Sequence, residues 1–419
     1  MTDTSAVTRP PSLLALYDPQ WKLDPYALYR AMRTDGVVVW DEWMRTWLVL
    51  GYEEIVQLSK DERLTGARVE SFYEQLPASA RTEMKPLKTA LADMMLFNEP
   101  PRHTRLRRLI KPGLTPRFIR ELRPLVEEIA DDLLDQVVGS GRMDVIRDFS
   151  EPLTRRVVGR LAGVPDDALH LLSDWPGLLH EFFTQSRRAV PRINELRAVF
   201  DRQTAARRAG TAEDLFSRMI AGQLDDADYT DDEVFANFLL LIDAGQATTT
   251  HVIGNAVLAL IQQPDQQSLL RERPELANGA AYEFLRYDGS VQFTSRVALD
   301  DLEIGGRRIR RGDTVTLVLG AGNRDPEHYP DPDRLDVARR AADQLSFGHG
   351  IHYCLGAALA VTEIEIGIAA LLRRAGDLHT VDAEPDWLES VNFRFLQRLP
   401  ITFTPLGRPA TTRGDRHDN

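Results

Sequence analysis

The sequence predicts a mostly α-helical protein with a minor β sheet, built as one domain. Apolar residues recur at helical spacing through most of the middle of the chain, whereas strand-like runs are few and short. No internal repeat, Gly/Ser linker or break in composition marks a domain boundary. We therefore expect a single domain over residues 13–406, flanked by disordered polar tails at 1–12 and 407–419.

The first predicted elements are an amphipathic helix and a hairpin. The helix covers residues 24–34, and two apolar, β-branched-rich runs at 37–40 and 47–50 are separated by a polar turn. Helical patterns then follow at 53–58, 103–110, 116–138, 151–161, 166–181 and 192–208.

The longest predicted helix runs from Thr230 to Gln263. Thr230 and Glu233 have the spacing of a capping box, and Pro264 ends the helical pattern. Such a helix would be about 50 Å long, enough to cross a whole domain. The remaining predicted elements are a helix at 274–287, short strands at 293–298, 302–304, 308–309 and 314–319, and a last helix from just after Cys354 to about residue 374.

Composition excludes several classes of protein. The 419 residues include one cysteine, which rules out an intrachain disulfide, a Cys₄ zinc site and an iron–sulfur cluster. The 51 basic and 63 acidic residues leave a net charge of −12, which argues against nucleic-acid binding. The amino end lacks the pattern of a signal peptide, and no apolar run is long enough to cross a membrane. We therefore expect a cytoplasmic protein with no membrane or nucleic-acid partner.

The single cysteine lies in a glycine-rich loop at residues 347–356. Gly348, Gly350 and Gly356 indicate a tightly bent backbone, and a helical pattern starts directly after the loop. Cys354 is therefore expected at a helix N-terminus, where the helix dipole and free N–H groups favour a thiolate. Three interpretations are open: a buried structural cysteine, a nucleophile with a histidine partner, or a thiolate ligand of haem iron.

This loop closely resembles the haem-ligand loop of the cytochrome P450 family: Phe, two residues, Gly, three residues, Cys, one residue, Gly. The resemblance extends over residues 24–405. It implies the cytochrome P450 fold, haem b as cofactor and Cys354 as the axial thiolate ligand of its iron. It also implies that Phe347 and Gly348 contact the haem, and that O₂ is activated to oxidise a small organic molecule.

Other motifs match the family in the expected order. Glu283 and Arg286, spaced i and i+3, resemble its Glu-x-x-Arg pair, and Arg334 resembles the third member of this buried structural triad. Alone, any such cation is more often a surface charge. The resemblance further implies four partners for the haem propionates: His103, Arg107, Arg296 and His352.

The long predicted helix carries the motif that faces oxygen in this family. Ala244 and Gly245 have minimal side chains, and Thr248 matches the family's oxygen-activating, proton-relaying threonine. Ala247 replaces the acid that usually precedes this threonine, and Asp243 adds an unusual charge one turn earlier. Asp243 could replace the lost acid in proton relay, anchor a basic group of the substrate, or pair with an arginine.

The resemblance also indicates the substrate pocket and the electron supply. The pocket positions are rich in Met and Phe and favour an apolar or aromatic ligand, although each could equally be core: Met94, Met95, Leu96, Phe97, Leu178, Leu179, Phe182, Phe183, Leu240, Asp243, Val291, Gln292, Phe293, Asn392, Phe393 and Phe395. Electrons are expected from a ferredoxin and its reductase, steered by a basic stretch that comprises Arg102, Arg105, Arg108, Lys111 and Arg117.

The sequence therefore favours a stand-alone, bacterial-type P450 monooxygenase, most simply a hydroxylase of a secondary-metabolite intermediate. One alternative keeps the fold but changes the reaction, because Ala247 would alter proton delivery: coupling, ring closure, desaturation, nitration or peroxide-driven oxidation. The other alternative is a different class of protein, a haem-free thiol enzyme or a binding protein that uses Cys354 otherwise.

Overall fold

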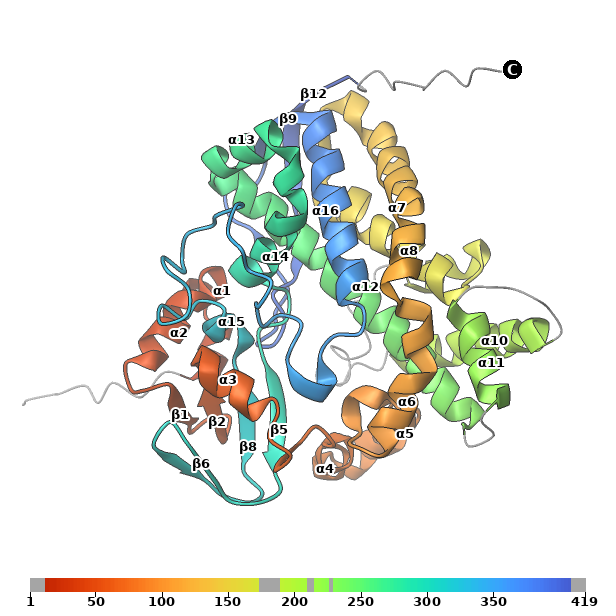
Figure 1. The fold of residues 1–419 in the computed structure, drawn as a ribbon, viewed down its shortest axis with the longest axis vertical. Helices are drawn as coiled ribbons and strands as arrows, with labels where there is room; N and C mark the ends of the chain where they lie inside the picture. Colours follow the sequence, from red (N-terminus) through yellow and green to blue (C-terminus); the bar gives the residue numbers. More distant parts are fainter. Residues whose placement is uncertain (1–11, 173–188, 209–214, 226–228, 408–419) are drawn as a thin grey trace, which may run out of the picture.

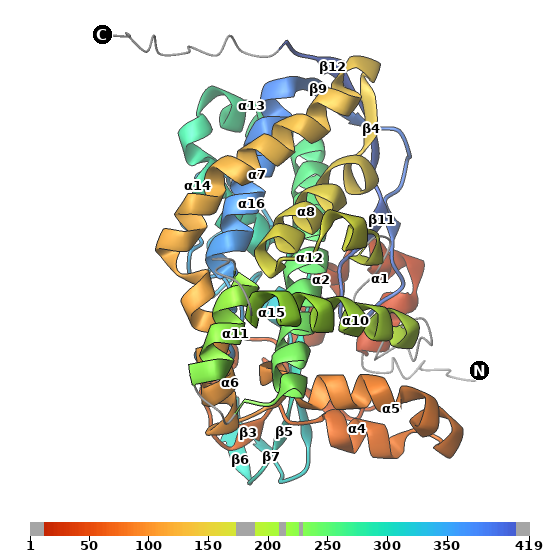
Figure 2. The ribbon, with the colours of Figure 1, turned by 90° about the vertical axis from the view of Figure 1, so that its right-hand side faces the viewer.

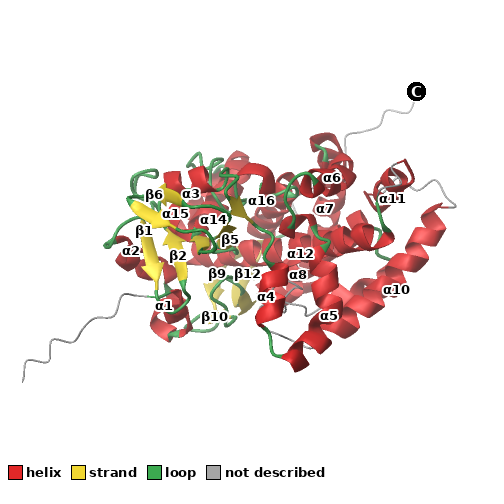
Figure 3. Cartoon of the chain, turned by 90° about the horizontal axis from the view of Figure 1, so that it is seen from below, coloured by secondary structure: helices red, strands yellow, loops and turns green. Residues whose placement is uncertain are grey.

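The computed structural model describes residues 12–172, 189–208, 215–225 and 229–407. Helices form most of this part of the chain, and the strands β1, β2, β5 and β8 gather at one side of them, as Figures 1 and 3 show. No helix within the described ranges combines the length and the apolar character needed to cross a membrane.

The α-helices have clear boundaries, and most of them begin or end at a capping residue, a proline or a glycine. In chain order they are α1 (Pro19–Leu23), α2 (Pro25–Arg33), α3 (Tyr52–Leu58), α4 (Val69–Gln75), α5 (Ala78–Ala92), α6 (Arg102–Ile110), α7 (Pro116–Val137), α8 (Glu151–Ala162), α10 (Ala189–Arg208), α11 (Leu215–Asp225), α12 (Asp231–Gln262), α13 (Pro264–Glu272), α14 (Ala277–Asp288), α15 (Leu319–Gly322) and α16 (Ala357–Arg374).

The strands form small sheets. The largest has the order β1-β2-β8-β5-β3, with β1 (Val38–Asp41), β2 (Thr46–Val49), β8 (Thr314–Leu317), β5 (Thr294–Ala298) and β3 (Leu64–Thr65). A second sheet has the order β4-β12-β9, with β4 (Arg142–Asp144), β12 (Pro400–Pro405) and β9 (Ala375–Thr380). Two-stranded pairs complete the described β structure: β6 (Leu302–Ile304) with β7 (Arg307–Ile309), and β10 (Asp386–Trp387) with β11 (Leu396–Arg398).

Helix α12 is the central element and confirms its prediction closely. The Thr230 hydroxyl accepts a hydrogen bond from the Glu233 N–H (3.1 Å), and the Glu233 carboxylate accepts one from the Thr230 N–H (3.2 Å), so the capping box is formed. The helix crosses the molecule and contacts α8, α14 and α16 (Figure 2). Helix α16 begins at Ala357, just after Cys354, as the sequence predicts. These two helices position the functional site.

Three predictions of local structure differ from the fold. The predicted helix at 166–181 begins as a 3₁₀ helix, Asp166–Leu172, and its remainder lies outside the described residues. Ser12, predicted to belong to a disordered tail, is buried and donates to the Asp41 carboxylate at 2.9 Å. The rest of that tail, and residues 408–419, lie outside the described ranges. The sheet β4-β12-β9 has no counterpart in the prediction, because its short strands pair across distant parts of the chain.

Candidate active site

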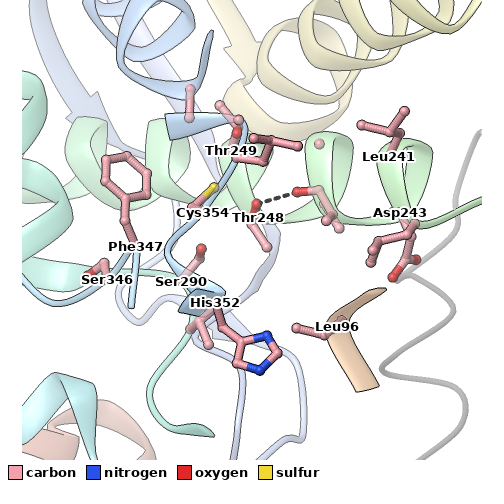
Figure 4. Close-up of a pocket in the computed structure, with 18 of the residues that line it drawn as sticks. Leu96, Leu241, Asp243, Thr248, Thr249, Ser290, Ser346, Phe347, His352 and Cys354 are labelled. Carbon is pink, nitrogen blue, oxygen red and sulfur yellow. Dashed lines mark hydrogen bonds between the residues drawn. The ribbon is translucent and has the colours of Figure 1, made fainter. Parts of the chain in front are cut away.

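A cavity of about 320 Å³ lies between α12, the loop before α16, helix α6 and strand β5. Its walls are mainly apolar, and its polar groups cluster at a few points (Figure 4). Such a cavity, apolar with few convergent polar groups, has the size and character of a small-molecule site.

The cysteine loop forms one wall of this cavity. Gly348 and Gly350 have φ of +69° and +71°, the left-handed region that glycine tolerates. A Cβ added at Gly350 would also lie 2.3 Å from the carbonyl oxygen of Ser59, so the bend requires glycine there. The Cys354 N–H donates to the Phe347 carbonyl at 2.8 Å, which closes the loop. Phe347 and Cys354 line the cavity, whereas Gly348 supplies the bend without being part of the lining.

The pKa of the Cys354 thiol differs from the prediction that the helix N-terminus favours a thiolate. Burial raises the pKa of the Cys354 thiol, and the Gly356 N–H and the Arg107 charge oppose this shift only in part. The proximity of α16 therefore does not by itself make a thiolate, because the helix starts three positions later and desolvation acts on the sulfur directly. A coordinated metal ion would deprotonate such a thiol outright. Among the described residues, no histidine is hydrogen-bonded to Cys354, which leaves the Cys–His nucleophile without its base.

All four side chains expected to bind propionates line the cavity: His103, Arg107, Arg296 and His352. The rings of His103 and His352 meet edge to face with centroids 4.6 Å apart, and Arg107 donates to the Tyr353 carbonyl at 2.8 Å. Burial, with help from the His352 and Arg107 charges, lowers the pKa of His103 to about 4. The Nε2 atom of His103 is buried and has no hydrogen-bond partner in the part of the chain that the structure describes. Burial also lowers the pKa of Arg107 and of Arg296.

Two further charged residues belong to this region and were missed by the sequence reasoning. The Glu99 carboxylate accepts from the Gly66 N–H at 2.6 Å and from the Thr65 hydroxyl at 3.2 Å, and it lies 3.6 Å from His352 Nε2. Arg68, in the loop after β3, also lines the cavity. Neither has a sequence signal, because Arg68 reaches the site from the connection between β3 and α4 and Glu99 reaches it from the segment before α6.

These residues fit haem. Arginines and histidines gather here around one carboxylate, that of Glu99, and His103 Nε2 has no hydrogen-bond partner among the described residues. Such a group needs anionic partners, and the two propionates of haem would supply them. The single thiol of the cavity lining, Cys354, matches a thiolate ligand of haem iron, and the apolar walls suit a flat porphyrin.

The ionic triad is formed, with one correction. Glu283 and Arg286 are fully buried and joined by two hydrogen bonds of 2.7 and 2.8 Å. The third cation is Arg339, whose Nε lies 3.2 Å from the Glu283 carboxylate. The prediction of Arg334 is wrong: Arg334 contributes its backbone carbonyl, which accepts from Arg286. Both arginines lie in one loop, and the turn after Asp336 directs Arg339 back toward Glu283.

The α12 segment forms the wall that faces the cysteine loop. Ala244, Gly245, Ala247 and Thr248 line the cavity, and the Thr248 hydroxyl donates to the Ala244 carbonyl at 2.7 Å (Figure 4). This bond holds the hydroxyl oxygen at the cavity wall, where its lone pairs remain able to accept. Asp243 is buried and also lines the cavity.

The other predicted pocket residues divide into three groups. Many line the cavity, namely Met95, Leu96, Phe97, Leu240, Val291, Phe293, Asn392, Phe393 and Phe395. Two do not, which corrects the prediction: Met94 is fully buried in the core, and Gln292 donates to the Gly289 carbonyl at 2.7 Å and accepts from the Tyr29 hydroxyl at 3.0 Å. The rest lie outside the described residues: Leu178, Leu179, Phe182 and Phe183.

The basic stretch near α6 is partly neutralised within the molecule. Arg102 and Arg105 both pair with Glu233 at the start of α12, at 3.0 and 2.5 Å, and Arg117 pairs with Glu121 at 2.9 Å. Arg108 and Lys111 are exposed. Of the five basic residues predicted to steer a ferredoxin, only these two therefore remain as candidates.

Comparison with known proteins agrees with this site. A cytochrome P450 family model matches residues 167–376. The biotin biosynthesis cytochrome P450 of Bacillus subtilis is 37% identical over 388 residues, which cover 91% of this chain and 96% of the relative. Cytochrome P450 monooxygenase PikC of Streptomyces venezuelae is 34% identical over 423 residues, 98% of this chain and 99% of the relative.

A solved structure extends the agreement to three dimensions. The crystal structure of CalO2 superposes with a TM-score of 0.86 at 33% identity and covers 94% of this chain and 99% of its own. The cavity, the cysteine loop and these relatives lead to one assignment. The chain belongs to the cytochrome P450 family, whose members hold haem iron through a cysteine thiolate.

Proposed function

We propose that this P450 monooxygenase hydroxylates a small, largely apolar intermediate of secondary metabolism, with electrons supplied by a separate ferredoxin. The observation that carries the proposal is the cavity itself. It places the single thiol, Cys354, on one wall and the small-residue segment with Thr248 on the facing wall, with apolar side chains between them. A substrate held there would present a carbon to the reaction centre while water is largely excluded.

Each side chain has a distinct task in this proposal. Bound haem supplies the redox chemistry that activates O₂. Cys354 would hold the iron as a thiolate, and the propionates would be held by His103, Arg107, Arg296 and His352. Ala244 and Gly245 leave room for a diatomic ligand beside α12. Thr248 holds a proton at its Oγ1 atom, within reach of the cavity, and can pass it on.

The overall reaction balances as a monooxygenation. One carbon–hydrogen bond of the substrate breaks and a carbon–oxygen bond forms with one atom of O₂. The other oxygen atom leaves as water, after two electrons and two protons have been taken up. The electrons come from the ferredoxin, which its reductase reduces again, and the protons reach the cavity through Thr248 and ordered water.

Ala247 supports a second candidate reaction within the same fold. It lines the cavity with a methyl group at the position where the family usually carries a carboxyl group. Altered proton delivery would favour coupling, ring closure, desaturation, nitration or peroxide-driven oxidation over simple hydroxylation. Oxidation under labelled O₂ separates the candidates, because hydroxylation leaves one labelled oxygen atom in the product.

Asp243 has three possible roles, and one variant separates them. In Asp243→Asn, loss of turnover with substrate affinity retained would indicate proton relay. Loss of affinity for a cationic substrate alone would indicate an anchor, and loss of folding alone would indicate a structural ion pair. Thermal stability and spin-state titrations, measured on one preparation, give the three readouts.

The test of the proposed function is spectroscopic. Purified protein should bind haem, and its reduced form should give the red-shifted Soret band of a thiolate-ligated haem on exposure to CO. Cys354→Ser should lose this band and all oxidation while it retains the helical circular-dichroism spectrum, because no second cysteine exists. A wild-type protein without the band would instead favour a haem-free thiol enzyme or a binding protein.

A further inference from the structure

Arg68 is a charged side chain in the cavity lining whose role the haem does not explain. It lies between β3 and α4, is partly buried, and donates from Nη1 to the carbonyl oxygen of Ser295. Its guanidinium stands 5.4 Å from the centroid of the Phe97 ring, which is itself a wall of the cavity. The backbone and ring contacts hold the guanidinium in place but do not neutralise its charge.

No carboxylate of the described residues pairs with Arg68. Glu70, the nearest acid in sequence, pairs with Lys88 at 2.6 Å. Glu99 is engaged by the Thr65 hydroxyl, the Gly66 N–H and the His352 ring. Burial, together with repulsion from the Arg296 charge, lowers the pKa of Arg68 to about 9, and no acid within the described ranges opposes this shift. A desolvated arginine that lies beside a second arginine and lacks a counter-ion costs free energy. An anion bound in the cavity would reduce that cost.

The haem already has enough partners without Arg68. Two propionates carry two negative charges, and the site offers them two arginines and two histidines. Arg68 is a third arginine, displaced toward Phe97 and the apolar lining, which includes Met95, Leu96 and Phe293. The charge therefore adjoins the surfaces that would contact a substrate.

We propose that Arg68 binds the carboxylate of the substrate, and that the enzyme oxidises an organic acid with a largely apolar body. The carboxylate accepts hydrogen bonds from the Arg68 guanidinium, and the apolar body lies along the Met and Phe side chains toward α12. The carbon oxidised is then remote from the acid group, near Thr248. This inference rests on the proposed function and names its substrate class.

The test compares an acid with its uncharged analogue. Tetradecanoic acid and tetradecanamide are titrated into the haem-loaded enzyme, and the change in spin state gives each dissociation constant. We expect the wild type to prefer the acid, and Arg68→Gln to weaken acid binding roughly 10- to 100-fold while amide binding stays the same. Arg68→Lys should keep part of the preference. Arg63→Gln is the matched control, since Arg63 lies in the same segment but is paired with Asp61 at 2.6 Å.

Each result decides the proposal. Equal binding of acid and amide by the wild type, or unchanged acid binding in Arg68→Gln, would overturn it. Loss of haem or of the reduced-CO band in Arg68→Gln, with Arg63→Gln unaffected, would show that Arg68 serves a propionate and would overturn it too. Absence of the reduced-CO band from the wild type would refute the proposed function instead, so the two failures are distinguishable.

Discussion

At the scale of single residues, Glu363 on α16 has a buried carboxyl group that is costly to ionise. Its carboxyl group lines the cavity at 1% exposure, and neither oxygen has a hydrogen-bond partner among the described residues. Burial raises its pKa well above the ordinary value of 4.5. The folded protein therefore binds this proton more tightly than the unfolded chain does, so Glu363 lowers the stability of the fold as pH rises above the unfolded pKa.

We expect Glu363→Gln to remove this pH dependence. Glutamine has the shape of the protonated acid but cannot ionise. As pH rises above the ordinary pKa of 4.5, the wild type should lose unfolding free energy through this group, by at most about 1.4 kcal/mol per pH unit, and the variant should not. Urea unfolding at several pH values measures the difference. Parallel pH profiles for the two proteins would show that Glu363 stays charged and paired in solution.

We expect the coupling of electron uptake to product formation to depend on Thr248. Its hydroxyl is held at 2.7 Å from the Ala244 carbonyl, facing the cavity. Since Ala247 supplies no acid, we expect Thr248→Ala to lower product formed per electron by roughly tenfold or more and to release hydrogen peroxide instead. Thr248→Ser keeps the hydroxyl and should retain most of the coupling. Unchanged coupling in Thr248→Ala would indicate that protons arrive by another route.

At the scale of elements, the ionic triad joins α14 to the loop that precedes the cysteine. Arg339 is largely buried against Glu283, whereas Arg334 offers only its carbonyl. We expect Arg339→Ala to destabilise the fold by about 1.5–3 kcal/mol, the contribution of a hydrogen bond to a charged group. Arg334→Ala keeps the backbone carbonyl and should have little effect. Thermal unfolding of the two variants decides between them; equal losses would restore Arg334 to the triad.

The elements also show which features a sequence can predict. Helix α12 is predictable because its capping box and the proline after it are local signals, and the sequence beyond Cys354 likewise indicates α16. The choice between Arg334 and Arg339 is not local, since it depends on a turn formed by tertiary contacts. The same limit applies to the neighbours Met94 and Met95, of which only the second faces the cavity.

At the scale of the whole molecule, the sequence predicts the site residues that belong to a haem-binding motif of the family. It does not predict the charged residues that only the fold brings to the site. The side chains predicted to bind propionates come from α6, β5 and the cysteine loop, and family motifs predict them. Arg68 and Glu99 reach the same place from two different connecting segments, neither of which carries a motif. The overall charge of −12 gives no indication of this local positive cluster, because net charge reports on the surface as a whole.

The distribution of charge over the molecule leads to a prediction about the electron donor. An acidic ferredoxin would be steered by exposed cations near the cysteine loop. Arg108 and Lys111 are the exposed members of the basic stretch that form no ion pair with a described residue. We expect the double variant Arg108→Glu/Lys111→Glu to slow reduction by ferredoxin roughly tenfold or more at low salt, with a smaller difference at high salt as screening grows. Arg117→Glu is the control, because Arg117 already pairs with Glu121. Stopped-flow reduction under CO at several salt concentrations measures the rates.

Arg102 and Arg105 are unsuitable for this experiment, since each pairs with Glu233 and reversing its charge would disturb α12. If the double variant reacted like the control at every salt concentration, the donor would dock on another surface.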